Sequence, residues 1–119
     1  MEGYFYAKIE AFEVQVYSDS PVDLETDAVI YLGLADEAYP RAELWFIDRA
    51  KDIIPENRIA TTHTTGSGAF LAYFRSEKMR AIIDLLRDHD RVWFTWDESR
   101  VAAIRIGREP AADSSEADG

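Results

Sequence analysis

The chain has 119 residues, of which 47% are hydrophobic and 13% aromatic, and its formal net charge is -10. This length fits one domain, and the apolar content is sufficient for a packed core, which excludes a disordered chain. The absence of cysteine excludes disulfides, thiolate chemistry and cysteine-based zinc sites. The acidity disfavours direct contact with nucleic acid or anionic membranes. Since neither a signal peptide nor an apolar run of membrane-spanning length is recognisable, we expect a soluble cytoplasmic protein.

The first predicted element is a long strand over residues 4–18, rich in aromatic and β-branched side chains. Its alternation of apolar and polar residues changes phase at Ala11–Phe12. A strand with a period of two residues cannot change phase without an extra residue, so we predict a β-bulge or sharp bend at this point.

Four further strands are expected before any helix. Residues 18–27 read as an acidic loop, and residues 28–34 as a buried central strand. A strand over 42–49 and a connection over 50–57 follow. Residues 58–64 and 69–75 then form a predicted hairpin, because the glycines between them permit the positive backbone angles of a tight loop.

One helix is predicted, over residues 76–89, with Ser76 as its N-cap. Its apolar residues recur at helical spacing and form one stripe that needs a sheet face to cover: Met79, Ile82, Ile83 and Leu86. Residues 91–97 and 101–107 complete the domain as a second hairpin.

These elements predict an α+β fold: a curved, mostly antiparallel sheet of about seven strands, in the chain order βββββαββ, with one amphipathic helix packed on one face. The domain is expected to cover residues 1–107. Residues 108–119 lack apolar periodicity and carry one arginine against four acids, which predicts a disordered acidic tail.

The glycine-rich stretch around His63 is the first place to look for chemistry. As a ligand site it would use Thr61, His63, Thr65 and Ser67, with backbone amides holding an anion. However, the stretch leads into a strand, lacks the lysine of a phosphate-binding loop, and lacks the spacing of a nucleophile elbow. The pattern therefore favours a plain turn between two strands.

No motif in the sequence predicts a metal or a cofactor. His63 and His89 have no histidine partner at ligand spacing, and His89 lies where helix C-terminal capping would place it. The acidic loop over residues 18–27 lacks the central glycine and distal glutamate of an EF-hand. We therefore expect no cofactor and no metal, and assign no catalytic residue.

The aromatic residues suggest an interaction surface. Trp93 and Trp96 are three residues apart, so in a regular strand they lie on opposite faces. Because one helix covers one face only, the other face is a candidate dimer or partner interface through Tyr4, Tyr6, Trp45, Tyr73 and Trp93. The alternative is that these rings belong to a sandwich-like or strongly curved core. A stacking platform for single-stranded nucleic acid is disfavoured by the net charge.

Residues 69–110 contain a recognisable order of short motifs. They are an aromatic strand (Ala72–Tyr73–Phe74), a helix with Leu85–Leu86–Arg87, a short strand (92–95) and the ending Gly107–Pro110. In this order they resemble the C-terminal half of small bacterial proteins of uncharacterised function. The resemblance implies a shared β–α–β–β unit and no activity.

The expected function is that of a non-enzymatic interaction protein that binds a protein partner or a second copy of itself through the aromatic face. Two alternatives stay open. One is an acidic inhibitor or nucleic-acid-mimicking decoy that occupies a basic protein surface. The other is a small-ligand-binding protein or minor enzyme that uses the His63 loop.

Overall fold

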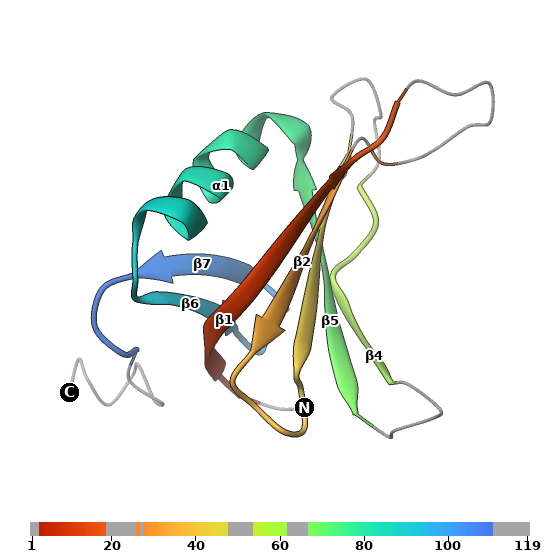
Figure 1. The fold of residues 1–119 in the computed structure, drawn as a ribbon. Coiled ribbons are helices and arrows are strands. Elements are labelled where there is room, and N and C mark those ends of the chain that lie inside the picture. Colours follow the sequence, from red (N-terminus) through yellow and green to blue (C-terminus); the bar gives the residue numbers. More distant parts are fainter. Residues whose placement is uncertain (1–2, 19–25, 27, 48–53, 62–66, 111–119) are drawn as a thin grey trace.

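The computed structural model describes residues 3–18, 26, 28–47, 54–61 and 67–110 (Figure 1). Five strands come first: β1 (Phe5–Val16), β2 (Ala28–Leu34), β3 (Arg41–Ile47), β4 (Arg58–Thr61) and β5 (Gly68–Arg75). A 3-10 turn, η1 (Ser76–Lys78), leads into α1 (Met79–Asp88), and β6 (Val92–Trp96) and β7 (Ala102–Ile106) follow. The curved sheet with one helix, predicted from the sequence, is therefore confirmed.

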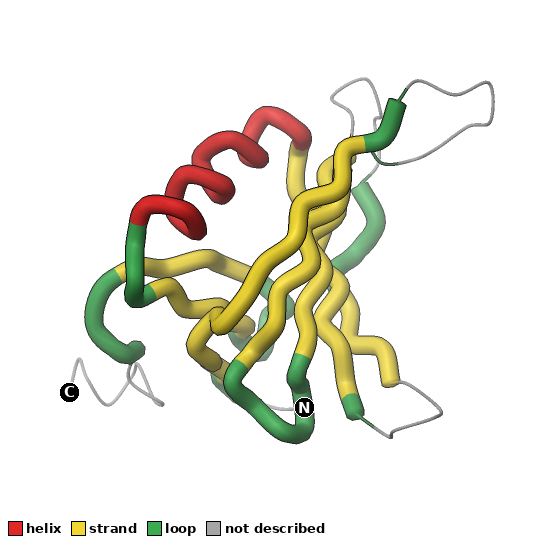
Figure 2. The backbone as a smooth tube through the Cα atoms, viewed as in Figure 1, coloured by secondary structure: helices red, strands yellow, loops and turns green. Residues whose placement is uncertain are grey.

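The seven strands form one sheet in the spatial order β4-β5-β3-β2-β1-β6-β7, which curls into a half-barrel (Figure 2). All neighbouring strands are antiparallel except β3 and β5, which are parallel. The sheet is therefore mixed: five of its six neighbouring pairs are antiparallel, in keeping with the mostly antiparallel sheet that was predicted, and one is parallel. The reason is that β4 pairs beyond β5, so β5 returns beside β3 in the same direction.

The predicted bulge in β1 is present, slightly before the phase change that indicated it. Ile9 pairs with Leu34 and Ala11 pairs with Gly33, so Glu10 is the extra residue. Ahead of the bulge, Ala7 and Ile9 enter the core, and after it Val14 packs against the core. The extra residue therefore moves the core-facing positions of β1 from odd to even numbers, as a one-residue insertion must.

The core fills the concave side of the half-barrel, with Phe70 of β5 at its centre. Its ring centroid lies 4.8 Å from that of Trp96 and 5.0 Å from that of Phe94, both on β6. In a flat sheet, β5 and β6 would be about 19 Å apart, because three strands separate them. Ring contact between these strands thus requires the strong curvature. Phe5 and Tyr39 complete the cluster around Phe70.

The helix crosses the concave side from β5 to β6 (Figure 1). Ile82 and Leu86 are buried, and Met79 and Ile83 pack against the core, which confirms the predicted apolar stripe. The predicted N-cap was wrong. Ser76 begins the 3-10 turn, and the cap positions are Arg75 for η1 and Lys78 for α1, neither with a side-chain cap hydrogen bond.

Candidate functional site

The predicted loop site around His63 lies only partly within the described residues. Thr61 is exposed at the end of β4, where it pairs with Gly68, and Ser67 is half-buried. His63 and Thr65 belong to residues 62–66, outside the described part of the chain. The antiparallel pairing of β4 with β5 does confirm that the stretch connects two strands of a hairpin.

The five predicted interface aromatics are half-buried, and they fall into two separate clusters. Tyr6 lies 6.2 Å from Tyr4 and 6.0 Å from Trp93, between ring centroids. Trp45 lies 6.5 Å from Tyr73. The four that belong to strands alternate with core residues, so they lie on the convex, outer face of the sheet, and Tyr4 lies beside Tyr6 just before β1 begins. The predicted separation of Trp93 from Trp96 is confirmed, because Trp96 is buried in the core.

The two clusters do not form one surface. Trp45 pairs with Val29 on β2, and Val29 pairs with Gln15 on β1. Tyr6 lies nine residues before Gln15 on β1. At about 3.3 Å per residue, this separates the clusters by roughly 30 Å along β1. The sequence alone could not show whether these aromatics form one patch or two, because the distance between the clusters depends on strand order and register.

The first cluster, Tyr4–Tyr6–Trp93, carries positive charge. Lys8 and Arg105 are the two residues that pair with Trp93 on the neighbouring strands. The Arg105 guanidinium donates a hydrogen bond of 3.2 Å from Nη1 to the Tyr4 hydroxyl. The Trp93 indole donates one of 3.0 Å to the carbonyl of Gly107. These contacts fix the orientation of the rings on the outer face.

The second cluster has acidic surroundings instead. The Trp45 indole donates a hydrogen bond of 3.1 Å to Glu43, which also forms an ion pair with Arg41. On the neighbouring strand, burial raises the pKa of Tyr31, and contact with Tyr17 and the charges of Glu43 and Glu13 raise it further. The two aromatic clusters therefore differ in the charges that surround them.

Next to the first cluster, the edge of the sheet is free. β7 is the last strand, and no described strand pairs with its outer edge. Two apolar side chains near its ends are exposed, Val101 by 57% and Ile106 by 44%. A free edge with exposed apolar side chains is a template for pairing with another strand.

A cleft of about 220 Å³ opens where β6 and α1 separate from β1. It is lined by the bulge of β1, the end of α1 and the start of β6: Ile9, Glu10, Ala11, Phe12, Leu86, His89, Asp90 and Val92. This cleft was not predicted from the sequence. The phase change at Ala11–Phe12 was the available signal, since bulges commonly redirect side chains beside functional sites.

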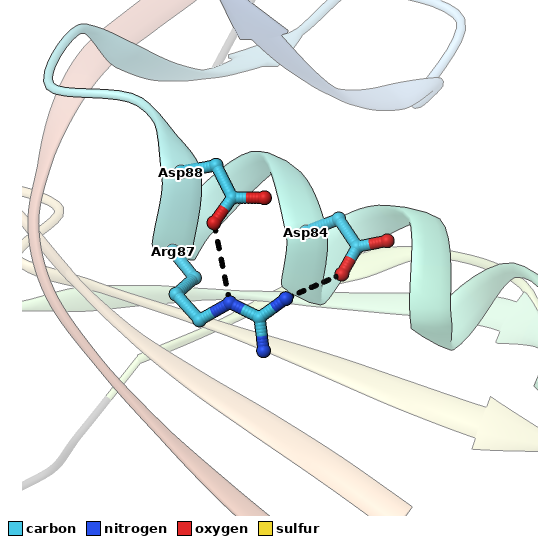
Figure 3. Close-up of polar contacts among 3 residues, drawn as sticks. All are labelled: Asp84, Arg87 and Asp88. Atoms are coloured by element: carbon cyan, nitrogen blue, oxygen red, sulfur yellow. Dashed lines mark hydrogen bonds and ion pairs between the residues drawn. The ribbon is translucent and has the colours of Figure 1, made fainter.

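Two carboxylates in the cleft, those of Glu10 and Asp90, make no hydrogen bond or ion pair with the described residues. Two nearby acids on α1, Asp84 and Asp88, share one arginine (Figure 3). Arg87 donates from Nη2 to Asp84 at 3.0 Å and from Nε to Asp88 at 3.2 Å. Glu10 and Asp90 are therefore the acids that line the cleft itself and have no arginine or lysine partner among the described residues.

The negative charge of the chain is unevenly distributed. The described residues contain 11 Lys and Arg against 13 Asp and Glu, a net charge of -2. The remaining -8 belongs to segments outside the described residues, chiefly residues 19–27 and 111–119. The described strands and helix therefore carry little net charge, and most of the acidity on which the decoy alternative depends lies outside them.

Within the described ranges, no group of three or more His, Asp or Glu side chains could hold a metal ion. No described helix is long and apolar enough to cross a membrane. Comparison with protein-family models, curated proteins and solved structures returns no match.

Proposed function

We propose that this protein is a non-enzymatic interaction protein that self-associates by antiparallel pairing of β7 with β7 of a second copy. The first aromatic cluster, Tyr4–Tyr6–Trp93, would flank this interface. The observation that carries the proposal is the free edge of β7, with exposed apolar side chains, directly beside half-buried aromatic rings.

The sequence of β7 is complementary to itself in one register. Pairing about Ile104 would place Ala102 opposite Ile106 of the second copy, and Ala103 opposite Arg105. The first pair covers an exposed apolar side chain, and the second places no like charges opposite each other. The two half-barrels would then share one continuous sheet, an isologous contact typical of two-fold dimers.

The aromatic cluster would support the same interface. Arg105 is already oriented by its hydrogen bond to the Tyr4 hydroxyl and lies beside Trp93. In the proposed register it extends over Ala103 of the second copy, whose small side chain leaves space for it. Arg and aromatic residues are enriched at interface hot spots for this reason: they give large contact area with defined geometry.

Sedimentation equilibrium over a range of protein concentrations tests the proposal. In the dimer, Ala103→Arg places an arginine opposite Arg105 of the other copy at two equivalent positions. It should therefore weaken dimerisation at least about tenfold. Ala103→Glu places opposite charges there and should strengthen it. Both substitutions change the same outward-facing position and differ in the sign of the added charge.

A second pair of variants tests the apolar contact. Ile106→Lys should weaken dimerisation about tenfold, because it removes an apolar side chain from the contact. Val16→Lys is the matched control, since Val16 is also exposed but lies on β1. A monomer at all concentrations, or a dimer that responds equally to Ala103→Arg and Ala103→Glu, would contradict the proposal.

A further inference from the structure

We propose that the cleft between β1 and α1 binds an extended, basic peptide segment of a partner protein. The segment adds to the free edge of β1 at residues 11–16 as a further strand. This proposal is independent of self-association through β7, which lies at the edge of the sheet.

The first support is the backbone of β1 beyond its bulge. β1 pairs with β6 only from Phe5 to Lys8, whereas its pairing with β2 continues to Val16. From residue 11 to residue 16, no described strand lies on the side where β6 would continue. In an antiparallel ladder, alternate residues direct their amide and carbonyl groups away from the partner. These groups are available to a peptide that adds a strand.

The second support is the pattern of side chains along this edge. Phe12 is 40% exposed and Val16 is 67% exposed, while Val14 between them packs against the core. All three lie on the concave face of the sheet, another part of which is covered by α1, and Phe12 also lines the cleft. A bound strand with apolar residues at alternate positions would cover the exposed apolar surface of Phe12 and Val16.

The third support is the charge at the end of this edge. Glu10 and Asp90 line the cleft without partners among the described residues, and Leu86 and Val92 provide apolar walls. A lysine or arginine side chain fits this combination, because its apolar stem packs on the walls while its head meets two carboxylates. The same carboxylates disfavour a nucleic acid or an acidic peptide.

The tail of this chain does not fit the cleft. Residues 111–119 contain three acids and no basic residue, so their charge has the same sign as that of Glu10 and Asp90. A partner protein with a basic, apolar-alternating segment is the complementary ligand.

Fluorescence anisotropy with synthetic peptides tests the proposal on the full chain. The probe is a labelled peptide of roughly ten residues, capped at both ends, in which valine and threonine alternate. Two versions are made, one with an arginine near the N-terminus and one with the arginine near the C-terminus. We expect saturable binding of one of them. Replacing its arginine with citrulline, a neutral isostere, should weaken binding about threefold to fivefold.

Two further comparisons separate strand addition from simple charge attraction. N-methylation of alternate peptide nitrogens removes the ladder hydrogen bonds while keeping the side chains, and should abolish binding. The variant Glu10→Gln/Asp90→Asn should bind the arginine peptide as weakly as the unaltered protein binds the citrulline peptide. Glu98→Gln, an exposed acid in the β6–β7 turn, is the matched charge control and should leave binding unchanged.

Several results would overturn the proposal. The first is the absence of saturable binding up to about 1 mM peptide. The second is equal binding of the arginine and citrulline peptides, and the third is equal binding of the N-methylated and unmethylated peptides. An apparent peptide affinity that falls as the protein concentration rises would show instead that a second copy of the chain occupies the cleft. Because the peptide changes are tested on the unaltered protein, these outcomes remain decisive even if the double variant folds poorly.

Discussion

At the scale of single residues, Thr26 shows how one buried hydroxyl closes the end of a ladder. It is 7% exposed, and its Oγ1 lies 2.8 Å from the carbonyl oxygens of both Ala28 and Phe46. Ala28 and Phe46 are themselves paired across β2 and β3. The hydroxyl therefore donates where the two strands begin to separate. Nothing in the sequence distinguished Thr26 from the rest of its acidic loop.

Thr26→Val should lower the free energy of unfolding by about 1–2 kcal/mol, because it keeps the side-chain volume and removes the one O–H that two buried carbonyls share. Chemical denaturation measures the effect. Thr95→Val is the matched control: Thr95 is equally buried, but its side chain makes no hydrogen bond with the described residues. Its stability should stay within about 0.5 kcal/mol of the unaltered protein. Equal losses for both variants would mean that the Thr26 hydrogen bonds contribute no stability.

At the scale of elements, the β6–β7 turn has a recognisable design. The amide of Arg100 donates to the carbonyl of Asp97, and the Asp97 side chain accepts from the amides of Ser99 and Val101. Arg100 has a φ of 64°, the left-handed conformation that follows a type I turn in three-residue hairpin loops. The Asp97 side chain thus stabilises the turn, and Arg100 adopts a backbone conformation that glycine adopts more readily.

Arg100→Gly should raise the free energy of unfolding by about 1 kcal/mol, because glycine adopts positive φ without steric cost. Ser99→Gly, in the same turn, is the control and should lower it by about 0.5–1 kcal/mol, since Ser99 has no positive φ to relieve. Thermal unfolding of the two variants gives the comparison. If Arg100→Gly proves no more stable than Ser99→Gly, the backbone strain inferred at Arg100 is absent.

The elements themselves were largely predictable from sequence, because each depends on local patterns. Alternation identified the strands, the phase change located the bulge near Glu10, and the apolar stripe identified α1. The 3-10 turn before α1 was missed because Ser76 followed by Glu77 reads as an ordinary helix start. The cleft was missed because it requires knowing that α1 ends beside the bulge, a contact between residues about 80 apart in the chain.

At the scale of the whole molecule, the curvature of the sheet depends on contacts that no local pattern encodes. The parallel placement of β3 beside β5 and the meeting of Phe70 with Trp96 are both non-local. One polar side chain, that of Asn57, also connects parts of the half-barrel that are far apart in the sequence. Asn57 accepts a hydrogen bond from the amide of Tyr73 on β5, and its Nδ2 donates one to the carbonyl of Arg100 in the β6–β7 turn; both are 2.8 Å.

Asn57 should therefore hold the β6–β7 hairpin against the opposite side of the half-barrel. Asn57→Ala removes both hydrogen bonds and should lower the free energy of unfolding by about 1–3 kcal/mol. Asn57→Asp keeps the acceptor for Tyr73 and loses the donor to Arg100. Hydrogen exchange separates the two: the Tyr73 amide should exchange faster in the Ala variant only, and the β6–β7 hairpin should exchange faster in both. If the hairpin keeps its protection in both variants, aromatic packing around Phe70 holds the half-barrel together without Asn57.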